Sequence, residues 1–217
     1  MYNIAIDGPA GAGKSTIAKI VAKKLEFIYV DTGAMYRTLA LACFRAGIDA
    51  SEEAKVIEKC KDVTVTLGYE DGTQKVYLNG EDVSQEIRRE EIGNMTSAIA
   101  VYGPVRELMV AMQQKLAREN NVVMDGRDIG TVVLPNADLK VYLTASARTR
   151  AERRYKELIE KGQECNLDAI EEDIKKRDER DMNREVAPLK QAEDAVLVDS
   201  SDMDIDQVVE TIVSLAK

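Results

Sequence analysis

The stretch Gly8-Pro9-Ala10-Gly11-Ala12-Gly13-Lys14-Ser15 decides which fold we expect for this chain. It matches the pattern G-x-x-x-x-G-K-[ST] at every fixed position, after a short apolar run and before an amphipathic segment. Glycines in such a loop let successive backbone N–H groups turn onto phosphate oxygens, and the next helix adds its positive N-terminal end. We therefore predict a P-loop in which Lys14 reaches the β- and γ-phosphates of ATP and the Ser15 hydroxyl holds Mg²⁺. The residues expected to bind ATP are Gly8, Pro9, Ala10, Gly11, Ala12, Gly13, Lys14, Ser15 and Thr16.

The rest of the chain alternates strand and helix patterns around this loop. Short apolar runs without polar alternation are typical of strands that are buried on both faces of a parallel sheet. We predict strands at residues 3–6, 27–30, 121–124, 138–143 and 195–198, and helices at residues 16–25, 34–46, 105–118 and 205–216. This alternation predicts an α/β fold of the P-loop NTPase type, with a doubly wound five-stranded parallel sheet.

Two segments interrupt the alternation. Apolar residues alternate over 63–67, Glu70-Asp71-Gly72 is a turn sequence, and a second run follows at 75–78, which together predict a small antiparallel hairpin. The segment 147–190 carries 12 basic and 12 acidic residues, a pattern typical of two solvated helices with ion pairs between residues i and i+4.

The composition excludes several classes of function. The 217 residues carry a net charge of −9, so we expect no binding to nucleic acid or to an anionic membrane. Histidine is absent, which excludes Ser-His-Asp and Cys-His catalysis and histidine-based metal sites. Cys43, Cys60 and Cys165 form no CxxC pair, and we expect them to be buried or incidental thiols in a reducing compartment. No apolar run is long enough for a signal-peptide core or a membrane span, so the expected location is the cytoplasm.

Charge outside the P-loop separates the classes of nucleotide-binding protein. A GTPase switch carries an N-K-x-D-like loop that reads the base, and this sequence has none. Arginines are instead numerous near the candidate site, and a kinase needs them because its two anionic substrates must come into contact. The sequence therefore favours a kinase over a switch.

Several segments together resemble the bacterial cytidylate kinases, a family of nucleoside monophosphate (NMP) kinases of the P-loop class. The resemblance extends over essentially the whole chain, and its most specific motifs are D-[ST]-G-A-x-Y-R and D-G-R-D-x-G-T-V-V. Thr32 stands where the family has serine, and this substitution keeps the hydroxyl. The segments that carry the resemblance are residues 8–16, 31–37, 80–84, 125–133 and 177–189.

The resemblance implies how the chain is organised. We expect a single P-loop kinase domain over residues 1–217, with a core made of residues 1–33, 98–146 and 187–217. An NMP-binding region over about 34–97 would contain an antiparallel β insert at about 62–80, and a helical lid would extend over about 147–186. The implied partners are the small molecules ATP and CMP or dCMP, and we expect a monomer.

The resemblance also implies roles for residues that follow the predicted strands, at the edge where α/β sheets bind ligands. Asp125 is placed like a carboxylate behind the metal ion, Arg127 like a phosphate clamp, and Asp128 like the acceptor that distinguishes the cytosine amine from the uracil carbonyl. The loop 199–201 is placed like one that touches the adenine. The residues expected to bind CMP are Thr32, Tyr36, Arg37, Ser97, Arg106, Arg127, Asp128, Arg177, Asp181 and Arg184, and those expected to act in catalysis are Lys14, Asp125, Arg127, Arg153 and Arg184.

The residues alone leave structural alternatives open. Arg177, Asp181 and Arg184 recur at i, i+4 and i+7, so one helical face would carry all three, as a substrate site or as an intrahelical salt-bridge ladder. Asp128 could pair with Arg106 or Arg127 and orient it instead of reading the base. The other candidates for a purely structural role are Asp31 and Thr32 as helix caps, and Ser97 and Arg106 as solvated helix residues.

The reaction expected from these features is Mg²⁺-dependent transfer of the ATP γ-phosphoryl group to CMP, and to dCMP, by direct in-line attack. Positioning and charge neutralisation would provide the catalysis. Two alternatives remain at this point. The chain could be a kinase for another acceptor such as UMP, or a regulatory module that hydrolyses ATP slowly.

Overall fold

The computed structural model describes residues 1–70 and 73–216, and the chain divides into two compact units. The first unit comprises residues 1–29 and 120–217, and the second comprises residues 30–119. The boundaries expected for the core, the NMP-binding region and the lid are functional divisions, and they stay predictions.

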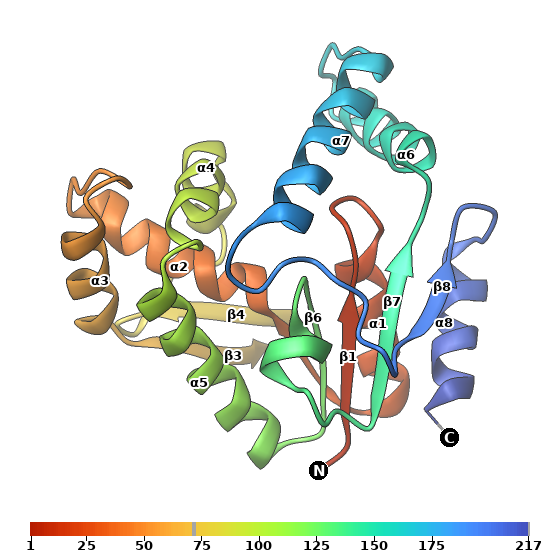
Figure 1. Cartoon of the computed structure of the whole chain (residues 1–217), viewed down its shortest axis with the longest axis horizontal. Coiled ribbons are helices and arrows are strands. Elements are labelled where there is room, and N and C mark those ends of the chain that lie inside the picture. The colour runs from red at the N-terminus through yellow and green to blue at the C-terminus, as the bar shows by residue number, and fades with distance from the viewer. Residues whose placement is uncertain (71–72, 217) are drawn as a thin grey trace. The chain divides into compact units, whose positions relative to one another are not determined.

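A five-stranded parallel sheet has the order β2-β6-β1-β7-β8 (Figure 1). The central strand β1 pairs with β6 on one side and β7 on the other, and its register brings Asp7 beside Gly126. The apolar, β-branched runs form strands that are largely buried in β1, β6 and β7, as the sequence predicted. The prediction of burial is wrong for β8, which lies at the edge of the sheet and has Leu197 55% exposed. The strands are β1 (Asn3–Asp7), β2 (Ile28–Asp31), β6 (Val122–Gly126), β7 (Leu139–Thr144) and β8 (Val196–Asp199), and they confirm all five predicted strands.

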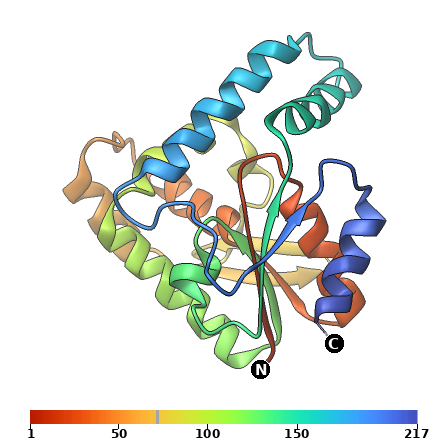
Figure 2. The ribbon, with the colours of Figure 1, turned by 45° about the vertical axis from the view of Figure 1, so that its right-hand side comes forward.

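Two helices of the first unit, α1 (Lys14–Leu25) and α8 (Ile205–Leu215), lie side by side and share one apolar core with the sheet (Figures 1 and 2). Helix α1 begins two residues before its predicted start, because Gly13 adopts a left-handed conformation (φ +84°) at its N-cap. Helix α8 begins with a capping box between Asp204 and Gln207. The core residues include Ile4, Ile6, Ile17, Val21, Val123, Val141, Leu143, Val198, Val209 and Ile212.

The charged segment forms two helices, α6 (Ala147–Glu160) and α7 (Leu167–Asn183), which lie side by side beyond the carboxyl end of β7 (Figures 1 and 2). This confirms the predicted pair of helices. The expectation that their charged side chains are all solvated is wrong at Arg150 and Asp178, which are buried. These two residues turn toward each other and form an ion pair, which the charge pattern alone did not single out.

The second unit combines helices with a small antiparallel sheet of order β3-β4-β5. The pairing of β3 with β4 confirms the predicted hairpin, while residues 71 and 72 of its expected turn lie outside the described residues. The sequence analysis did not predict α3, α4 or β5. The elements are α2 (Thr32–Arg45), α3 (Glu53–Lys61), β3 (Val65–Glu70), β4 (Thr73–Leu78), β5 (Glu81–Asp82), the 3₁₀ turn η1 (Glu86–Arg88), α4 (Glu90–Ile99) and α5 (Gly103–Glu119).

The cysteines behave as the sequence predicted, since all three are free thiols. Cys43 on α2 and Cys60 on α3 are buried, with their Sγ atoms 4.0 Å apart, and Cys165 is partly exposed. Within residues 1–70 and 73–216, no helix is both long and apolar enough to span a bilayer.

Gly8 provides a direct test of how closely the P-loop approaches the sheet. A Cβ atom at this position would lie 1.9 Å from the Leu143 carbonyl oxygen on β7, and the φ of +150° is unfavourable for other residues. We expect Gly8→Ala to lower the free energy of unfolding by about 3 kcal/mol or more, through overpacking and strain together. Gly13→Ala is the matched control, because Gly13 also has a positive φ but no atom within 4 Å of its added Cβ. It should cost about 1–2 kcal/mol, from strain alone. If urea unfolding shows the same loss of unfolding free energy for Gly8→Ala and Gly13→Ala, the close approach of Gly8 to β7 is contradicted.

Candidate functional site

The P-loop connects β1 to α1 and carries a buried amine. Lys14 is 5% exposed, and its Nζ donates to the Pro9 carbonyl oxygen at 2.7 Å. Burial, followed by the charge of Arg127, lowers the pKa of Lys14 well below its usual range, while the carboxylates of Asp125 and Asp7 oppose this shift. A bound phosphate group would supply the anionic partner that favours the charged amine.

Ser15, the predicted metal ligand, lies beside the predicted carboxylate Asp125. The Ser15 hydroxyl donates to Asp125 Oδ2 at 2.9 Å, and the hydroxyl of Tyr29 donates to Asp125 Oδ1 at 2.8 Å. The sequence analysis missed Tyr29, because a tyrosine at the end of a strand is as common in a core as in a site. A hydroxyl next to a buried carboxylate is a set of oxygen donors that suits a hard cation such as Mg²⁺.

A further buried carboxylate, Asp7, lies at the end of β1 directly before the P-loop. Its Oδ1 accepts a hydrogen bond from the Ile129 backbone N–H at 2.8 Å, and its Oδ2 accepts one from Gly130 at 2.7 Å. Burial raises the pKa of Asp7 to about 6, and Asp128 adds to this shift, whereas the two amides and Lys14 lower the pKa. The sequence analysis did not single out Asp7.

Arg127 and Asp181, which are far apart in the sequence, form an ion pair. Arg127 Nε donates to Asp181 Oδ2 at 2.9 Å, and each side chain is 22% exposed. Arg184 Nη2 lies 3.7 Å from Asp128 Oδ1. The first unit therefore brings four of the residues expected to bind CMP together as two arginine–carboxylate pairs.

The expectation that Arg177, Asp181 and Arg184 share one helical face is wrong for Arg184. Helix α7 ends at Asn183, and the backbone is extended at Arg184 (φ −66°, ψ 141°). The chain then turns back, so that the Leu189 N–H donates to the Asp181 carbonyl oxygen at 2.8 Å and Arg184 Nε donates to the carbonyl of Ala187. Arg184 reaches Asp128 from this turn instead of from the helix.

Arg150 is a second residue that sequence reasoning missed. Its guanidinium makes a bidentate ion pair with Asp178 on α7 (3.1 and 2.6 Å) and donates to the Ala10 carbonyl oxygen of the P-loop at 2.9 Å. The contact ties α6 and α7 to the phosphate-binding loop. No feature of the sequence around Arg150 distinguishes it from the other arginines of the charged segment. Only its burial in the folded structure does so.

Arg153, expected to neutralise the transferred phosphate, contacts the loop after β8 in this structure. Its Nη2 donates to the Ser200 carbonyl oxygen at 2.6 Å and its Nη1 to the Ser200 hydroxyl at 3.2 Å. Arg153 therefore lies beside the loop expected near the adenine, and its catalytic role stays a prediction.

The second unit carries the other residues expected to bind CMP. The Arg106 guanidinium lies over the Tyr36 ring at 6.0 Å, Arg37 Nη1 donates to the Ile87 carbonyl oxygen at 3.2 Å, and the Ser97 hydroxyl bonds within its own helix. Arg106 is 6% exposed, so the alternative that it is a solvated helix residue is wrong. The capping alternative is confirmed for Asp31, whose Oδ1 accepts the Ala34 N–H at 2.9 Å, and buried Thr32 is the first residue of α2.

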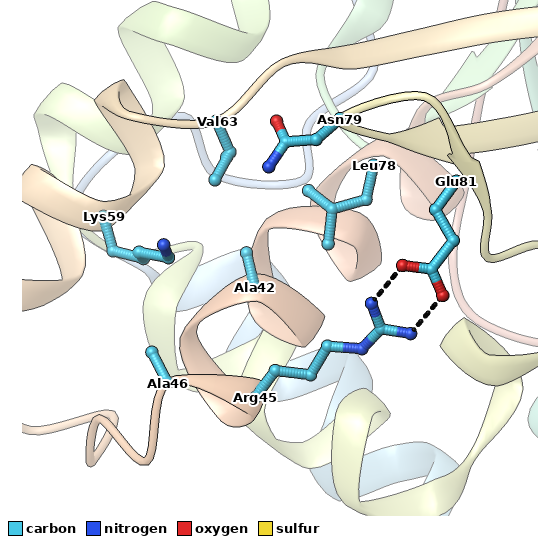
Figure 3. Close-up of a pocket in the computed structure, with 8 residues that line it drawn as sticks. All are labelled: Ala42, Arg45, Ala46, Lys59, Val63, Leu78, Asn79 and Glu81. Carbon is cyan, nitrogen blue, oxygen red and sulfur yellow. Dashed lines mark hydrogen bonds and ion pairs between the residues drawn. The ribbon is translucent and has the colours of Figure 1, made fainter.

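A cavity of about 310 Å³ in the second unit contains none of the predicted site residues (Figure 3). Two of its lining residues, Arg45 and Glu81, form a bidentate ion pair with each other at 2.7 and 2.8 Å. Its residues are Ala42, Arg45, Ala46, Lys59, Val63, Leu78, Asn79 and Glu81.

The first unit therefore holds the parts of a phosphoryl-transfer site: a glycine-rich loop, a buried lysine, a hydroxyl–carboxylate pair and arginines held by carboxylates. Such an arrangement can bind a polyphosphate and stabilise charge on a transferred phosphoryl group.

Known proteins similar to this chain agree with this chemistry. The family model described as cytidylate kinase matches residues 4–217. Cytidylate kinases of Bacillus cereus and Bacillus anthracis are 49% identical over 213 residues, which cover 98% of this chain and 95% of theirs. Among solved structures, shikimate kinase from Bacteroides thetaiotaomicron (TM-score 0.51, 17% identity, 99% and 97% covered) and a gluconokinase from Sinorhizobium meliloti (TM-score 0.52, 14% identity, 99% and 91% covered) share the fold. They confirm the predicted P-loop kinase fold.

The raised pKa of Asp7 predicts a pH-dependent stability difference. Between about pH 4 and pH 6 the folded chain keeps a proton on Asp7 that the unfolded chain has released, so this group's contribution to stability falls as the pH rises. The loss totals about 3 kcal/mol above pH 6, from a shift of about two units. Asp7→Asn removes the titration, so the unfolding free energy of the variant minus that of the wild type should rise by about this amount between pH 4 and pH 7 in urea titrations. A difference that is independent of pH would contradict the shift.

Proposed function

Because the chain belongs to the cytidylate kinase family, we propose that it transfers the γ-phosphoryl group of ATP to CMP, and to dCMP, and releases ADP and the nucleoside diphosphate. The observation that carries the proposal is the family match over residues 4–217. The geometry of the P-loop supports it, because Lys14 is buried within the loop and the Ser15 hydroxyl lies beside the Asp125 carboxylate.

The donor side of the proposed reaction uses the P-loop. The Ser15 hydroxyl would hold Mg²⁺ together with phosphate oxygens, and Asp125 would orient the ligands behind it. Tyr29 keeps the Asp125 carboxylate in place by its hydrogen bond to the other oxygen. When bound, Mg²⁺ would neutralise charge on the phosphates.

The transfer proceeds in line and without a covalent enzyme intermediate, since positioning and charge neutralisation suffice for phosphoryl transfer. Lys14, Arg127, Arg153 and Arg184 would share the negative charge that spreads over the transferred group. The contacts of Arg127 with Asp181 and of Arg184 with Asp128 hold two of these guanidinium groups in place. Arginines held in advance need little rearrangement during the reaction.

The acceptor nucleotide would be bound by the residues that the sequence analysis assigned to CMP. In the first unit, Arg127 and Arg184 would bind the CMP phosphate, Arg177 and Asp181 the sugar hydroxyls, and Asp128 the cytosine amine. The residues of the second unit proposed to bind CMP are Thr32, Tyr36, Arg37, Ser97 and Arg106. A cytoplasmic location and a monomeric state stay predictions.

A panel of nucleoside monophosphates tests the proposed function. ADP release is measured with CMP, dCMP, UMP and AMP as acceptors, and with no acceptor. Rates that rise with CMP and dCMP well above the others support the proposal. A rate highest with UMP would make the chain a kinase for another acceptor, and a slow rate unaffected by any acceptor would indicate a regulatory ATPase.

Lys14→Ala shows whether the P-loop performs the transfer. Loss of one preorganised group aimed at the transferred phosphoryl typically lowers kcat by about 10²–10³-fold, and we expect this for Lys14→Ala in the same assay. Lys23→Ala, on the exposed face of the same helix, is the control and should retain full activity. Activity of Lys14→Ala within about threefold of the control would exclude the P-loop as the transfer site.

Asp128→Asn tests the choice of base. A carboxylate accepts from the cytosine amine and repels the uracil carbonyl, and a site built to bond a substrate group strongly rejects analogues that lack it. We expect a loss of about tenfold or more in kcat/KM for CMP and a smaller ratio of CMP to UMP activity, with ATP affinity nearly unchanged. If CMP and UMP rates fall together and their ratio holds, Asp128 only orients Arg184, 3.7 Å away.

A further inference from the structure

Asp7 contacts the chain on both sides of the Arg127-Asp128 dipeptide. Before the dipeptide, the parallel ladder of β1 and β6 pairs Asp7 with Gly126. After it, the Asp7 carboxylate accepts the N–H groups of Ile129 and Gly130, at 2.8 and 2.7 Å. One residue therefore fixes the backbone immediately before and immediately after the two side chains.

The contact requires a carboxylate. Two successive N–H groups each bond to a different oxygen, so both acceptor atoms are used, and the side chain is 4% exposed. An amide would offer one acceptor and would turn its NH₂ group toward the second N–H. Gly130 fits closely against this contact, because a Cβ there would lie 3.4 Å from Asp7 Oδ2 and 3.1 Å from Lys140 Cδ.

The anchored peptides continue into a π-helical turn, η2 (Ile129–Val133). The N–H groups of Val132 and Val133 both donate to the Asp128 carbonyl oxygen, at 2.9 and 3.2 Å. The backbone of Asp128 is thus bonded to the same turn that Asp7 holds, and a shift of Ile129 and Gly130 would rotate the Asp128 side chain.

The stability of the fold does not explain why a buried carboxylate occupies position 7. Burial raises the pKa of Asp7 to about 6, so ionisation at neutral pH costs folding free energy. Lys14 is the cation that faces the carboxylate, while Asp128 adds like charge. A buried carboxylate that holds a loop at this cost points to a role in the site the loop carries.

We propose that Asp7 is a positioning residue for the acceptor nucleotide: it holds Arg127 and Asp128 in the orientation that binds the CMP phosphate and base, and it joins their loop to the P-loop that begins at Gly8. The inference rests on the proposed roles of Arg127 and Asp128. Asp7 itself contacts no reacting atom.

The test compares base discrimination in Asp7→Asn, Asp128→Asn and the double variant. A displaced Asp128 should reduce the ratio of kcat/KM for CMP to that for UMP, so Asp7→Asn should narrow it by about tenfold, an effect that misplacement by about 1 Å can produce. In the Asp128→Asn background, Asp7→Asn should change the ratio no further. ATP affinity, measured by equilibrium titration, should stay within about threefold of wild type, because Asp7 is proposed to position residues that bind the acceptor and not residues that bind ATP.

Asp138→Asn is the matched control, because Asp138 Oδ2 also accepts a backbone N–H, from Asn3 at 2.7 Å, but at the opposite end of β1. It should leave the ratio of CMP to UMP activity unchanged. A merely structural role of Asp7 would lower the yield or the melting temperature of Asp7→Asn as Asp138→Asn does, without changing base discrimination.

The outcomes separate the positioning role of Asp7 from the base-reading role of Asp128. If Asp128→Asn narrows the ratio and Asp7→Asn does not, the positioning role of Asp7 is wrong and the proposed role of Asp128 stands. If Asp128→Asn leaves the ratio unchanged, the base-reading role of Asp128 is wrong. In that case kcat/KM for CMP is compared among Asp7→Asn, Arg127→Met and the double variant. If the losses of the two single variants add up in the double variant, the inference that Asp7 positions this loop is overturned, and if they are not additive, the inference is supported.

A second variant covers the case in which Asp7→Asn does not fold. Gly130→Ala places a methyl group against Asp7 Oδ2 and Lys140, and so moves the Gly130 N–H from its acceptor while keeping the Asp7 carboxylate. We expect the same narrowing of the CMP to UMP ratio, and an unchanged ratio in a folded Gly130→Ala would overturn the inference.

Discussion

The contact between Gly8 and β7 is the constraint on which the rest of the site depends. With no Cβ at Gly8, the P-loop leaves β1 against the Leu143 carbonyl oxygen, where a side chain would meet backbone at 1.9 Å. This approach determines where the loop begins, and hence where the loop's own amides and Lys14 lie. Asp7, one residue earlier, is held at the end of the same strand and reaches the loop after β6. The P-loop and the loop after β6 are thus both fixed at the end of β1.

Ion pairs between arginines and carboxylates explain how several arginines lie close together in an acidic chain. The chain has a net charge of −9, yet two arginines of the first unit that have little exposure are each held by a carboxylate: Arg127 by Asp181 and Arg150 by Asp178. Buried pairs of this kind position their groups more than they stabilise the fold, and breaking one costs about 3–5 kcal/mol because a charge is left without a partner. The exposed ion pairs along α6 and α7 contribute little by comparison.

The sequence predicted the regular elements well and the short ones poorly. All five parallel strands and the β3–β4 hairpin were visible, because apolar runs and alternation are local properties. Helices α3 and α4 were missed, since they are short, with 9 and 10 residues, and β5 has only two residues. Arg184 was expected on the face of α7, but the helix ends before it, at a turn held by a bond from Leu189 to Asp181. Helical spacing cannot show where a helix stops when the stop is decided by a tertiary contact.

By itself, the sequence determined that this chain has a P-loop, a five-stranded parallel sheet and the motifs of the cytidylate kinase family. Those features follow from the order and spacing of residues, which a chain carries whether or not it is folded. Only the tertiary structure decided that Arg150 is buried against the P-loop, while Arg148 and Arg154 are exposed and Arg153 contacts Ser200. It also decided that Tyr29 bonds to Asp125 and that Asp7 holds Ile129 and Gly130. These contacts join residues about 100 or more positions apart, and burial and pairing over such distances depend on how the strands are ordered in the sheet.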